Sequence, residues 1–219
     1  MFARMLCLVA AFLFLCGSSL SYCRPFLIDA GHGGEDGGAV ANGVTEKDVN
    51  LAIALRLGEM LELFFVPVEY TRVDDSALHD AAASTVRARK SSDLKKRLAI
   101  ANDLEGGVYV AIHQNTYPSA SERGAQVFFS KKDPAARELA LRIKELIKTG
   151  VASNSGNNRE IKQANNVYIM DRLSIPGVIV ECGFITNPGE AELLCQSAFQ
   201  NEMAAAIMAA CLNFAAEDN

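Results

Sequence analysis

The 219-residue sequence has no tryptophan, only three histidines and few aromatic residues of any kind. It also lacks any run of basic residues, and its formal net charge is −5, which argues against a nucleic-acid partner. No internal repeat and no linker-like segment is visible. Half of the residues are hydrophobic, so the chain can bury a substantial core. Its length predicts one domain, or at most two small ones.

The sequence begins with an apolar run that is too short for a comfortable membrane span. Arg4 precedes this run, which covers residues 5–16, and small residues follow at 17–21. That order is typical of a secretory signal peptide. We therefore expect residues 1–21 to be a signal peptide and the mature chain to be exported. An uncleaved N-terminal anchor is the alternative.

The six cysteines do not form a disulfide framework. Three of them lie in or beside the expected signal peptide, at Cys7, Cys16 and Cys23. The other three, Cys182, Cys195 and Cys211, have spacings unlike any metal motif, and we expect them to be small buried hydrophobic residues. A pairing of Cys195 with Cys211 stays open in an oxidising compartment, although nothing in the sequence favours it.

Predicted strands and helices alternate through most of the chain. The predicted strands are 25–31, 66–72, 106–115, 124–130, 167–170 and 177–183. The predicted helices are 45–65, 93–104, 133–151, 187–194 and 197–214, and residues 74–92 are predicted as a loop or a loose helical excursion. The alternation predicts a single three-layer α/β domain with a mostly parallel or mixed central sheet flanked by helices. In such sheets, functional groups gather where strands end and loops begin.

Local patterns add detail to three of these segments. Thr45 and Asp48 fit a capping box at the start of helix 45–65. Asp36 is expected to brace the glycine-rich loop after the first strand through its own backbone, as aspartate does in turns. Arg97 lies on a predicted helix with three cations on its solvent-exposed face. We interpret Arg97 mainly as one of these solvated cations.

Four polar residues stand where strands end or where the first helix begins. His32 follows the first strand, His113 ends the third and Glu181 ends the last, while Glu46 opens helix 45–65. Two histidines and one glutamate form a common ligand set of hydrolytic zinc sites, which keep a fourth position for water. A second glutamate that is not a ligand can accept the proton of that water.

Each of these residues also has a purely structural interpretation. Taken alone, His32 would be a loop histidine among glycines, and Glu46 a first-turn acid that complements the helix dipole. A buried His113 bonded to the backbone is about as plausible as a ligand. Glu181 is the hardest to explain structurally, because a carboxylate at the end of a buried strand is costly without a nearby cation. The third histidine, His79, is given no role.

The residues around these positions resemble a known family. In chain order, the segments are LIDAGHGGEDGGA, TEKDVNLAIALRL, LKKRLAIAN, VYVAIHQN and VIVECGFITNPGEAELL. They resemble the zinc-dependent N-acetylmuramoyl-L-alanine amidases, the amidase-3 type of bacterial cell-wall hydrolase. Five motifs in the right order make the resemblance specific. It implies an amidase catalytic domain over residues 24–217.

The resemblance also implies a role for each matching residue. His32, Glu46 and His113 would ligate Zn²⁺, and Glu181 would be the catalytic carboxylate. The implied partner is peptidoglycan, cleaved at the amide bond between the lactyl group of N-acetylmuramic acid and L-alanine of the stem peptide. The compact core also resembles amidases of spore-forming bacteria that trim cortex peptidoglycan. The exported protein is then expected in the periplasm, the cell wall or the spore intermembrane space.

Several alternatives stay open at this point. The protein could be a zinc peptidase or carboxypeptidase acting on the stem peptide, or a non-catalytic zinc-holding module that binds the cell wall. Manganese or iron could occupy the same ligands. A protein activator or targeting partner is compatible with the sequence, and the oligomeric state is not indicated. Many relatives that act in cell division carry a plugging helix after the second histidine segment. Here only TYPSASER follows HQN, so we expect no built-in inhibitory helix.

Overall fold

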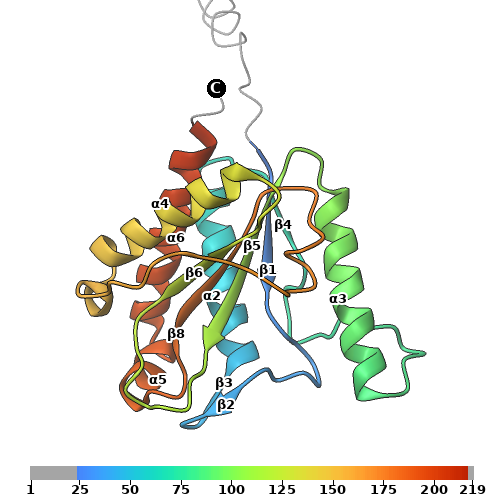
Figure 1. The fold of residues 1–219 in the computed structure, drawn as a ribbon, viewed down its shortest axis with the longest axis horizontal. Coiled ribbons are helices and arrows are strands. Elements are labelled where there is room, and N and C mark those ends of the chain that lie inside the picture. The colour runs from blue at the N-terminus through green and yellow to red at the C-terminus, as the bar shows by residue number, and fades with distance from the viewer. Residues whose placement is uncertain (1–23, 217–219) are drawn as a thin grey trace, which may run out of the picture.

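A six-stranded sheet forms the centre of the molecule (Figure 1). The computed structural model describes residues 24–216. The strands are β1 (Phe26–Ala30), β4 (Val68–Tyr70), β5 (Val108–Asn115), β6 (Gln126–Phe129), β7 (Lys162–Gln163) and β8 (Gly177–Phe184). Their order is β4-β1-β5-β8-β6-β7, in which β4, β1, β5 and β8 are parallel and β6 is antiparallel to β8. The expected mixed, mostly parallel sheet is confirmed.

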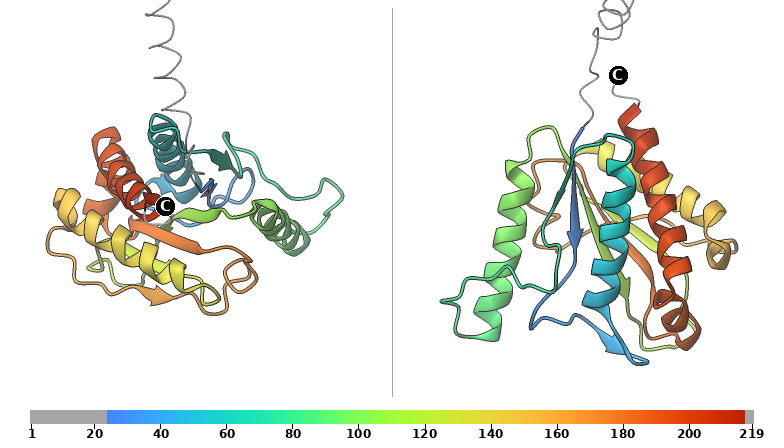
Figure 2. Two further views of the ribbon diagram at one scale, coloured as in Figure 1. Left: turned by 90° about the horizontal axis from the view of Figure 1, so that it is seen from above. Right: turned by 180° about the vertical axis from the view of Figure 1, so that it is seen from behind.

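Helices cover both faces of the sheet (Figure 2). They are α2 (Glu46–Glu62), α3 (Val86–Asp103), α4 (Pro134–Gly150), α5 (Pro188–Leu194) and α6 (Ser197–Ala216), joined by the short 3₁₀ turn η1 (Ala152–Asn154) and the hairpin of β2 (Val40–Ala41) and β3 (Val44–Thr45). α2, α4 and α6 pack on one face, and α3 lies over the other together with the segment 164–175. The three-layer architecture follows from this arrangement.

The alternation of side chains along each strand decides which layer a residue joins. On β1, Phe26 and Ile28 enter the large core under α2, α4 and α6, while Leu27 enters the smaller core under α3. On β5, Val110 and Tyr109 divide in the same way. Odd-numbered residues of these two strands therefore face α3, and this face includes the position of His113.

The structure corrects two of the predicted elements. Residues 167–170 form a turn, and the edge strand is β7 instead. Ile169 and Met170 are buried against the α3 face of the sheet. They are apolar because their segment packs over the sheet, not because it is a strand within it. Helix α3 begins at Val86 and not near residue 93, because Thr85 caps it by accepting a hydrogen bond from the backbone N–H of Ala88 at 3.1 Å.

Two smaller expectations also change. Thr45 is the N-cap of α2, but its side chain makes no capping hydrogen bond, so the capping box with Asp48 is not formed. The described cysteines are free: Cys182 and Cys211 are buried, whereas Cys195 is exposed, and no bond joins Cys195 to Cys211. Residues 1–21, the expected signal peptide, lie outside the described residues. Within residues 24–216, no helix is both long and apolar enough to cross a membrane.

Candidate metal centre and adjoining cavity

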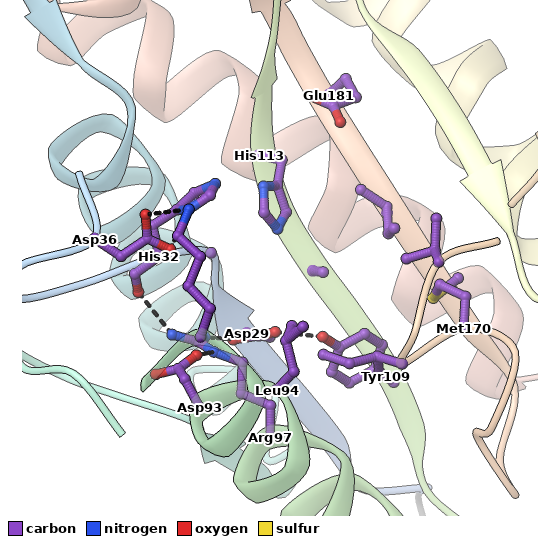
Figure 3. Close-up of a pocket in the computed structure, with 16 residues that line it drawn as sticks. Asp29, His32, Asp36, Asp93, Leu94, Arg97, Tyr109, His113, Met170 and Glu181 are labelled. Atoms are coloured by element: carbon purple, nitrogen blue, oxygen red, sulfur yellow. Dashed lines mark hydrogen bonds and ion pairs between the residues drawn. The ribbon is translucent and has the colours of Figure 1, made fainter. Parts of the chain in front are cut away.

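His113 and Glu181 are placed side by side by the register of two central strands. β5 and β8 are parallel neighbours, and the two residues are direct partners in their ladder. Side chains of paired residues leave a sheet on the same face, so both groups project toward α3 (Figure 3). The irregularity in the ladder between His113 and Asn115 comes immediately after this pair. Sheet pairing alone therefore fixes two of the four expected site residues.

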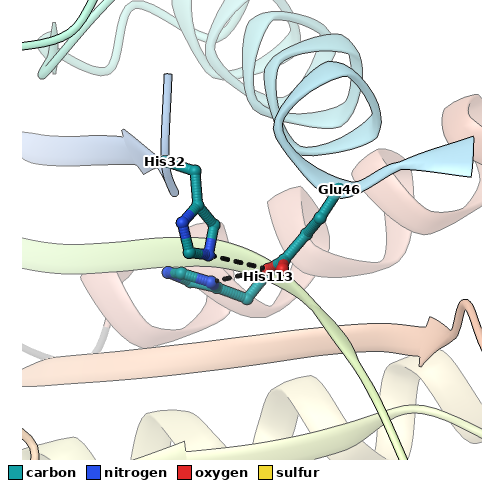
Figure 4. Close-up of side chains that lie close together, drawn as sticks. All are labelled: His32, Glu46 and His113. Carbon is teal, nitrogen blue, oxygen red and sulfur yellow. Dashed lines mark hydrogen bonds and ion pairs between the residues drawn. The ribbon is translucent and has the colours of Figure 1, made fainter. Parts of the chain in front are cut away.

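His32 and Glu46 reach the same place from the next elements along the chain. His32 follows the end of β1 in a left-handed conformation with φ of 62°, which turns the chain at the C-terminal end of this strand. Glu46 is the first residue of α2 and is 4% exposed. Figure 4 shows both imidazole rings next to the Glu46 carboxylate, with an interaction from each ring to it.

The three side chains form a compact group of nitrogen and oxygen donors. Glu46 Oε1 lies 3.3 Å from His32 Nε2 and 2.9 Å from His113 Nδ1. One ligand atom from each residue falls within 4.8 Å of the others. The rings of His32 and His113 meet edge to face, with centroids 5.1 Å apart. Two imidazole nitrogens and one carboxylate oxygen suit a tetrahedral zinc site with one open position.

The outer nitrogen of His32 is held by a second carboxylate. His32 Nδ1 lies 3.0 Å from Asp36 Oδ2, which leaves Nε2 to face Glu46. Such a carboxylate partner fixes the ring and its tautomer at metal sites. Asp36 Oδ1 also accepts a hydrogen bond from the backbone N–H of Gly38 at 3.4 Å. The expected backbone brace is thus present, and the contact with His32 is an addition that the sequence did not indicate.

Charges within the cluster shift its pKa values in opposite directions. Burial opposes ionisation of Glu46, but the adjacent His113 and His32 hold the pKa of its carboxyl far below the usual range. Burial also disfavours a charged His32, yet Glu46 and Asp36 raise the pKa of its imidazole. The cluster therefore presents an ionised carboxylate between two rings, and a divalent cation would satisfy the same charge.

Glu181 has a different environment from Glu46. Burial raises the pKa of its carboxyl to about 6. Among buried side-chain atoms of the described residues, Glu181 Oε2 is one of the few without a hydrogen-bond partner. An unpaired buried carboxylate oxygen is costly unless a ligand or water meets it. Glu181 is therefore poised beside the donor cluster with an unused proton acceptor.

Two glycines make room for the donor side chains. A Cβ on Gly31 would lie 2.3 Å from His113 Cε1, so only glycine lets the His113 ring pass over the end of β1. Gly38 has φ of +68°, and a Cβ there would lie 2.6 Å from Glu46 Oε2. The glycine-rich loop is thus required by close packing around the donors as well as by its turns.

Two buried arginines hold the loop that carries His32. Arg72 donates from Nε to the carbonyl oxygen of Ala30 at 2.9 Å and from Nη2 to that of Gly31 at 3.0 Å. Arg97 donates from Nη1 to Ala30 O at 3.0 Å and from Nη2 to His32 O at 2.7 Å. Three successive carbonyls are therefore fixed by two guanidinium groups, which we call the arginine clamp.

The sequence interpretation of Arg97 as a solvated cation is wrong. The residue is 2% exposed, and its guanidinium pairs with the buried carboxylate of Asp29, which also accepts hydrogen bonds from Thr71 and Tyr109. Burial opposes its charge, but Asp29 and Asp93 raise the pKa of the Arg97 guanidinium. Asp29 lies on the α3 face of β1. An acidic residue within this apolar strand was the sequence feature that could have indicated a buried ion pair.

A cavity of about 380 Å³ adjoins the donor cluster. His32, His113 and Glu181 stand at one end of it, and Asp29 and Arg97 at the other (Figure 3). Its apolar lining comes from α3, the sheet and the segment over the sheet, through Leu94, Ala111, Val167, Ile169, Met170 and Ile179. An extended substrate can therefore lie against the sheet with one end at the cluster.

Comparisons with known proteins place the chain among amidases. The sequence profile of the N-acetylmuramoyl-L-alanine amidase family matches residues 26–213. The chain is 33% identical over 190 residues to the germination-specific N-acetylmuramoyl-L-alanine amidase of Bacillus subtilis, covering 87% of this chain and 79% of that protein. It is 31% identical over 188 residues to the B. subtilis amidase LytC, covering 84% of this chain and 34% of LytC.

Solved structures give the same result. The CwlD amidase from Clostridioides difficile, in complex with the GerS lipoprotein, superposes with a TM-score of 0.85 and 35% identity, covering 89% of this chain and 100% of that one. A second N-acetylmuramoyl-L-alanine amidase, from Clostridium difficile 630, gives a TM-score of 0.78 and 26% identity, covering 91% of this chain and all of that one.

Proposed function

This chain belongs to the N-acetylmuramoyl-L-alanine amidase family, and on that premise we propose that His32, Glu46 and His113 hold a zinc ion for the family's reaction. The reaction is hydrolysis of the amide bond between the lactyl group of N-acetylmuramic acid and L-alanine of the stem peptide in peptidoglycan. The observation that carries the proposal is the convergence of three donor atoms within 4.8 Å beside the unpaired Glu181 Oε2.

The donor set fits zinc by number and by chemistry. It offers two imidazole nitrogens and one carboxylate oxygen, a combination found in open hydrolytic zinc sites. When bound, the ion would lower the pKa of a water molecule and polarise the substrate carbonyl. Asp36 holds the His32 ring through Nδ1, while Asn50 and the backbone N–H of Gln114 contact Glu46 Oε1 at 3.4 Å and 3.2 Å.

Glu181 acts as the proton carrier in this proposal. Its free Oε2 accepts a proton from the attacking water and then returns it to the leaving alanine nitrogen, which departs poorly without one. In the metal-free protein, burial raises the pKa of this carboxyl to about 6, so its surroundings oppose ionisation of the group that exchanges the proton. The neighbouring cavity holds the substrate against the sheet and limits its access to water.

Export and partners complete the proposal. Residues 1–21 direct the chain across the membrane to the peptidoglycan, in the periplasm, the cell wall or the spore intermembrane space. Residues 116–125, between β5 and β6, form turns and no helix, so access to the cluster is not controlled by a plugging helix there. Because CwlD of Clostridioides difficile forms a complex with a lipoprotein, a protein activator or targeting partner is proposed for this chain as well.

Digestion of purified sacculi tests the function. The full chain is incubated with sacculi, with and without a zinc chelator, and the soluble products are analysed by mass spectrometry. An amidase releases intact stem peptides that begin with a free L-alanine amine, and the chelator abolishes the release. Shortened stem peptides would instead identify a peptidase or carboxypeptidase. Retention on sacculi without any product, in the presence of zinc and a candidate activator, would indicate a binding module.

A further inference from the structure

A pair of buried carboxamides lies between α2 and β5, next to the donor cluster. Asn50, on α2, is 0% exposed, and Gln114, the residue after His113 on β5, is 4% exposed. Gln114 Nε2 donates to Asn50 Oδ1 at 3.1 Å. Nearby residues on the same two elements, Ile53 and Ile112 among them, belong to the large core. Polar side chains at such positions are costly unless they are hydrogen-bonded, so the partners of this pair need an explanation.

The Asn50 side chain contacts all three segments that carry the proposed ligands. Its Nδ2 donates to Gly31 O at 3.1 Å, and Gly31 directly precedes His32. The same nitrogen donates to Oε1 of Glu46, itself a proposed ligand, at 3.4 Å. Its Oδ1 accepts from Gln114, the neighbour of the third ligand. One side chain therefore bonds to a residue at, or directly beside, each of the three ligand positions.

The direction of these bonds follows from the donors and acceptors available. Gly31 O can only accept, so the amide nitrogen of Asn50 must face it. The amide oxygen of Asn50 then faces Gln114, which must present its own nitrogen. Gln114 Oε1 is left as one of the few buried side-chain atoms of the described residues without a hydrogen-bond partner. Reversing either amide would set two oxygens against each other, so the pair has one favourable orientation.

Both oxygens of the Glu46 carboxylate are held by N–H donors. Oε2 accepts from the backbone N–H of Ala39 at 2.9 Å. Oε1 accepts from the backbone N–H of Gln114 at 3.2 Å and from Asn50. Oε1 is also the atom that both imidazole rings contact (Figure 4). Asn50 supplies the one side chain among these three donors, so its replacement tests the arrangement without changing a ligand.

We propose that Asn50 is a positioning residue of the metal centre and that Gln114 fixes its orientation. This inference rests on the zinc ligands of the proposed function. Asn50 holds the carbonyl beside His32 and the Glu46 carboxylate together, so the ligand atoms keep their relative positions before a cation arrives. Groups that fix ligands in this way change metal affinity by about 10- to 100-fold. Neither amide lines the cavity, so both act only through the ligands.

Asn50→Leu tests the proposal against a matched control. Leucine keeps a similar volume in the core but makes none of the three contacts. Zinc affinity, measured by competition with a chromophoric chelator, should fall by about 10- to 100-fold, and the visible absorption spectrum of the Co²⁺-loaded protein should change. The control is Asn154→Leu, because Asn154 is also 0% exposed and its Oδ1 accepts from the backbone N–H of Ala125 at 2.8 Å. That variant should also unfold at a lower temperature, but with wild-type zinc affinity and Co²⁺ spectrum.

Equal zinc affinities and Co²⁺ spectra in the two variants would overturn the proposal, because Asn50 would then only stabilise the fold. Gln114→Met is the second test, and it serves even if Asn50→Leu does not fold. It keeps the length of the side chain and the backbone donor to Glu46 but removes Nε2, so it should shift the Co²⁺ spectrum and lower zinc affinity severalfold. Wild-type values for both would overturn the role of the pair. A wild-type chain that binds neither Zn²⁺ nor Co²⁺ would instead refute the metal centre itself, and this inference with it.

Discussion

The four site residues are held in two different ways. His113 and Glu181 are ladder partners on β5 and β8, so backbone pairing in the middle of the sheet positions them. His32 lies on a loop beyond β1, and the arginine clamp of Arg72 and Arg97 fixes the loop carbonyls. Backbone hydrogen bonds hold paired strands together, whereas the clamp depends on two particular side chains. We therefore expect His113 and Glu181 to lose function mainly when their own side chains are changed, and the proposed ligand His32 to lose it when distant residues are changed.

The largest expected effect comes from the strand-held side. Glu181→Gln removes the proton acceptor and preserves the shape of the side chain, so turnover of sacculi should fall by about 10²- to 10⁴-fold. Zinc content, measured by atomic absorption, should stay at the wild-type value because Glu181 is not a proposed ligand. Glu192→Gln, on an exposed residue of α5, serves as the matched control and should leave both quantities unchanged. Wild-type turnover in Glu181→Gln would refute the assignment of the base.

The comparison also explains what the sequence could predict. His113 and Glu181 were singled out because a polar residue after a buried apolar run is conspicuous. The α/β alternation predicted a mostly parallel or mixed sheet, but the pairing of their two strands is known only from the structure. His32 follows the end of β1 and Glu46 begins α2. Their positions alone did not assign them roles, and the family resemblance did. These residues do not determine which metal is bound, since imidazole and carboxylate ligands accept several divalent metals.

The contacts that hold the His32 loop were harder to predict. The clamp needs Arg97 to face inward, and the periodicity of a helix with several adjacent cations gives no sign of which cation is buried. Its partner Asp29 was visible in the sequence as an acid inside an apolar strand, but pairing the two requires the three-dimensional placement of α3 over β1. Residues 167–170 were misread for a related reason, because apolar residues in a covering segment have the same composition as a short strand.

The second-largest effect is expected where the His32 loop packs against the His113 ring. Gly31 belongs to the His32 loop, yet it makes space for the His113 ring, so Gly31→Ala would push that ring from its place. We expect zinc affinity, measured by competition with a chromophoric chelator, to fall by about 100-fold. Gly156→Ala is the matched control, since a Cβ there meets nothing within 4 Å. Wild-type affinity in Gly31→Ala would show that the ring can move without losing its ligand function.

Arg97→Lys tests the clamp itself. Lysine keeps a positive charge near Asp29 but has no planar fork with which to contact both Ala30 and His32. Zinc affinity should fall by about 10- to 100-fold, and the absorption spectrum of a Co²⁺-substituted sample should change as the ligand loop loosens. Arg87→Lys, on an exposed position of the same helix, should change neither. A Co²⁺ spectrum identical to that of the wild type would mean that the clamp stabilises the fold without positioning His32.

The smallest expected effect is a pH-dependent gain in stability when Glu181 is replaced. Burial raises the pKa of Glu181 from 4.5 to about 6, so the folded state of the metal-free protein disfavours its ionised form. This penalty is absent well below pH 4.5, grows as pH rises through that window, and levels off above pH 6. Glu181→Gln should therefore stabilise the metal-free protein by about 1 kcal/mol near pH 5 and about 2 kcal/mol near pH 8. Urea unfolding at several pH values measures the difference. A gain that is the same at pH 4 and pH 8 would show that Glu181 is not held in a desolvated position beside the cluster.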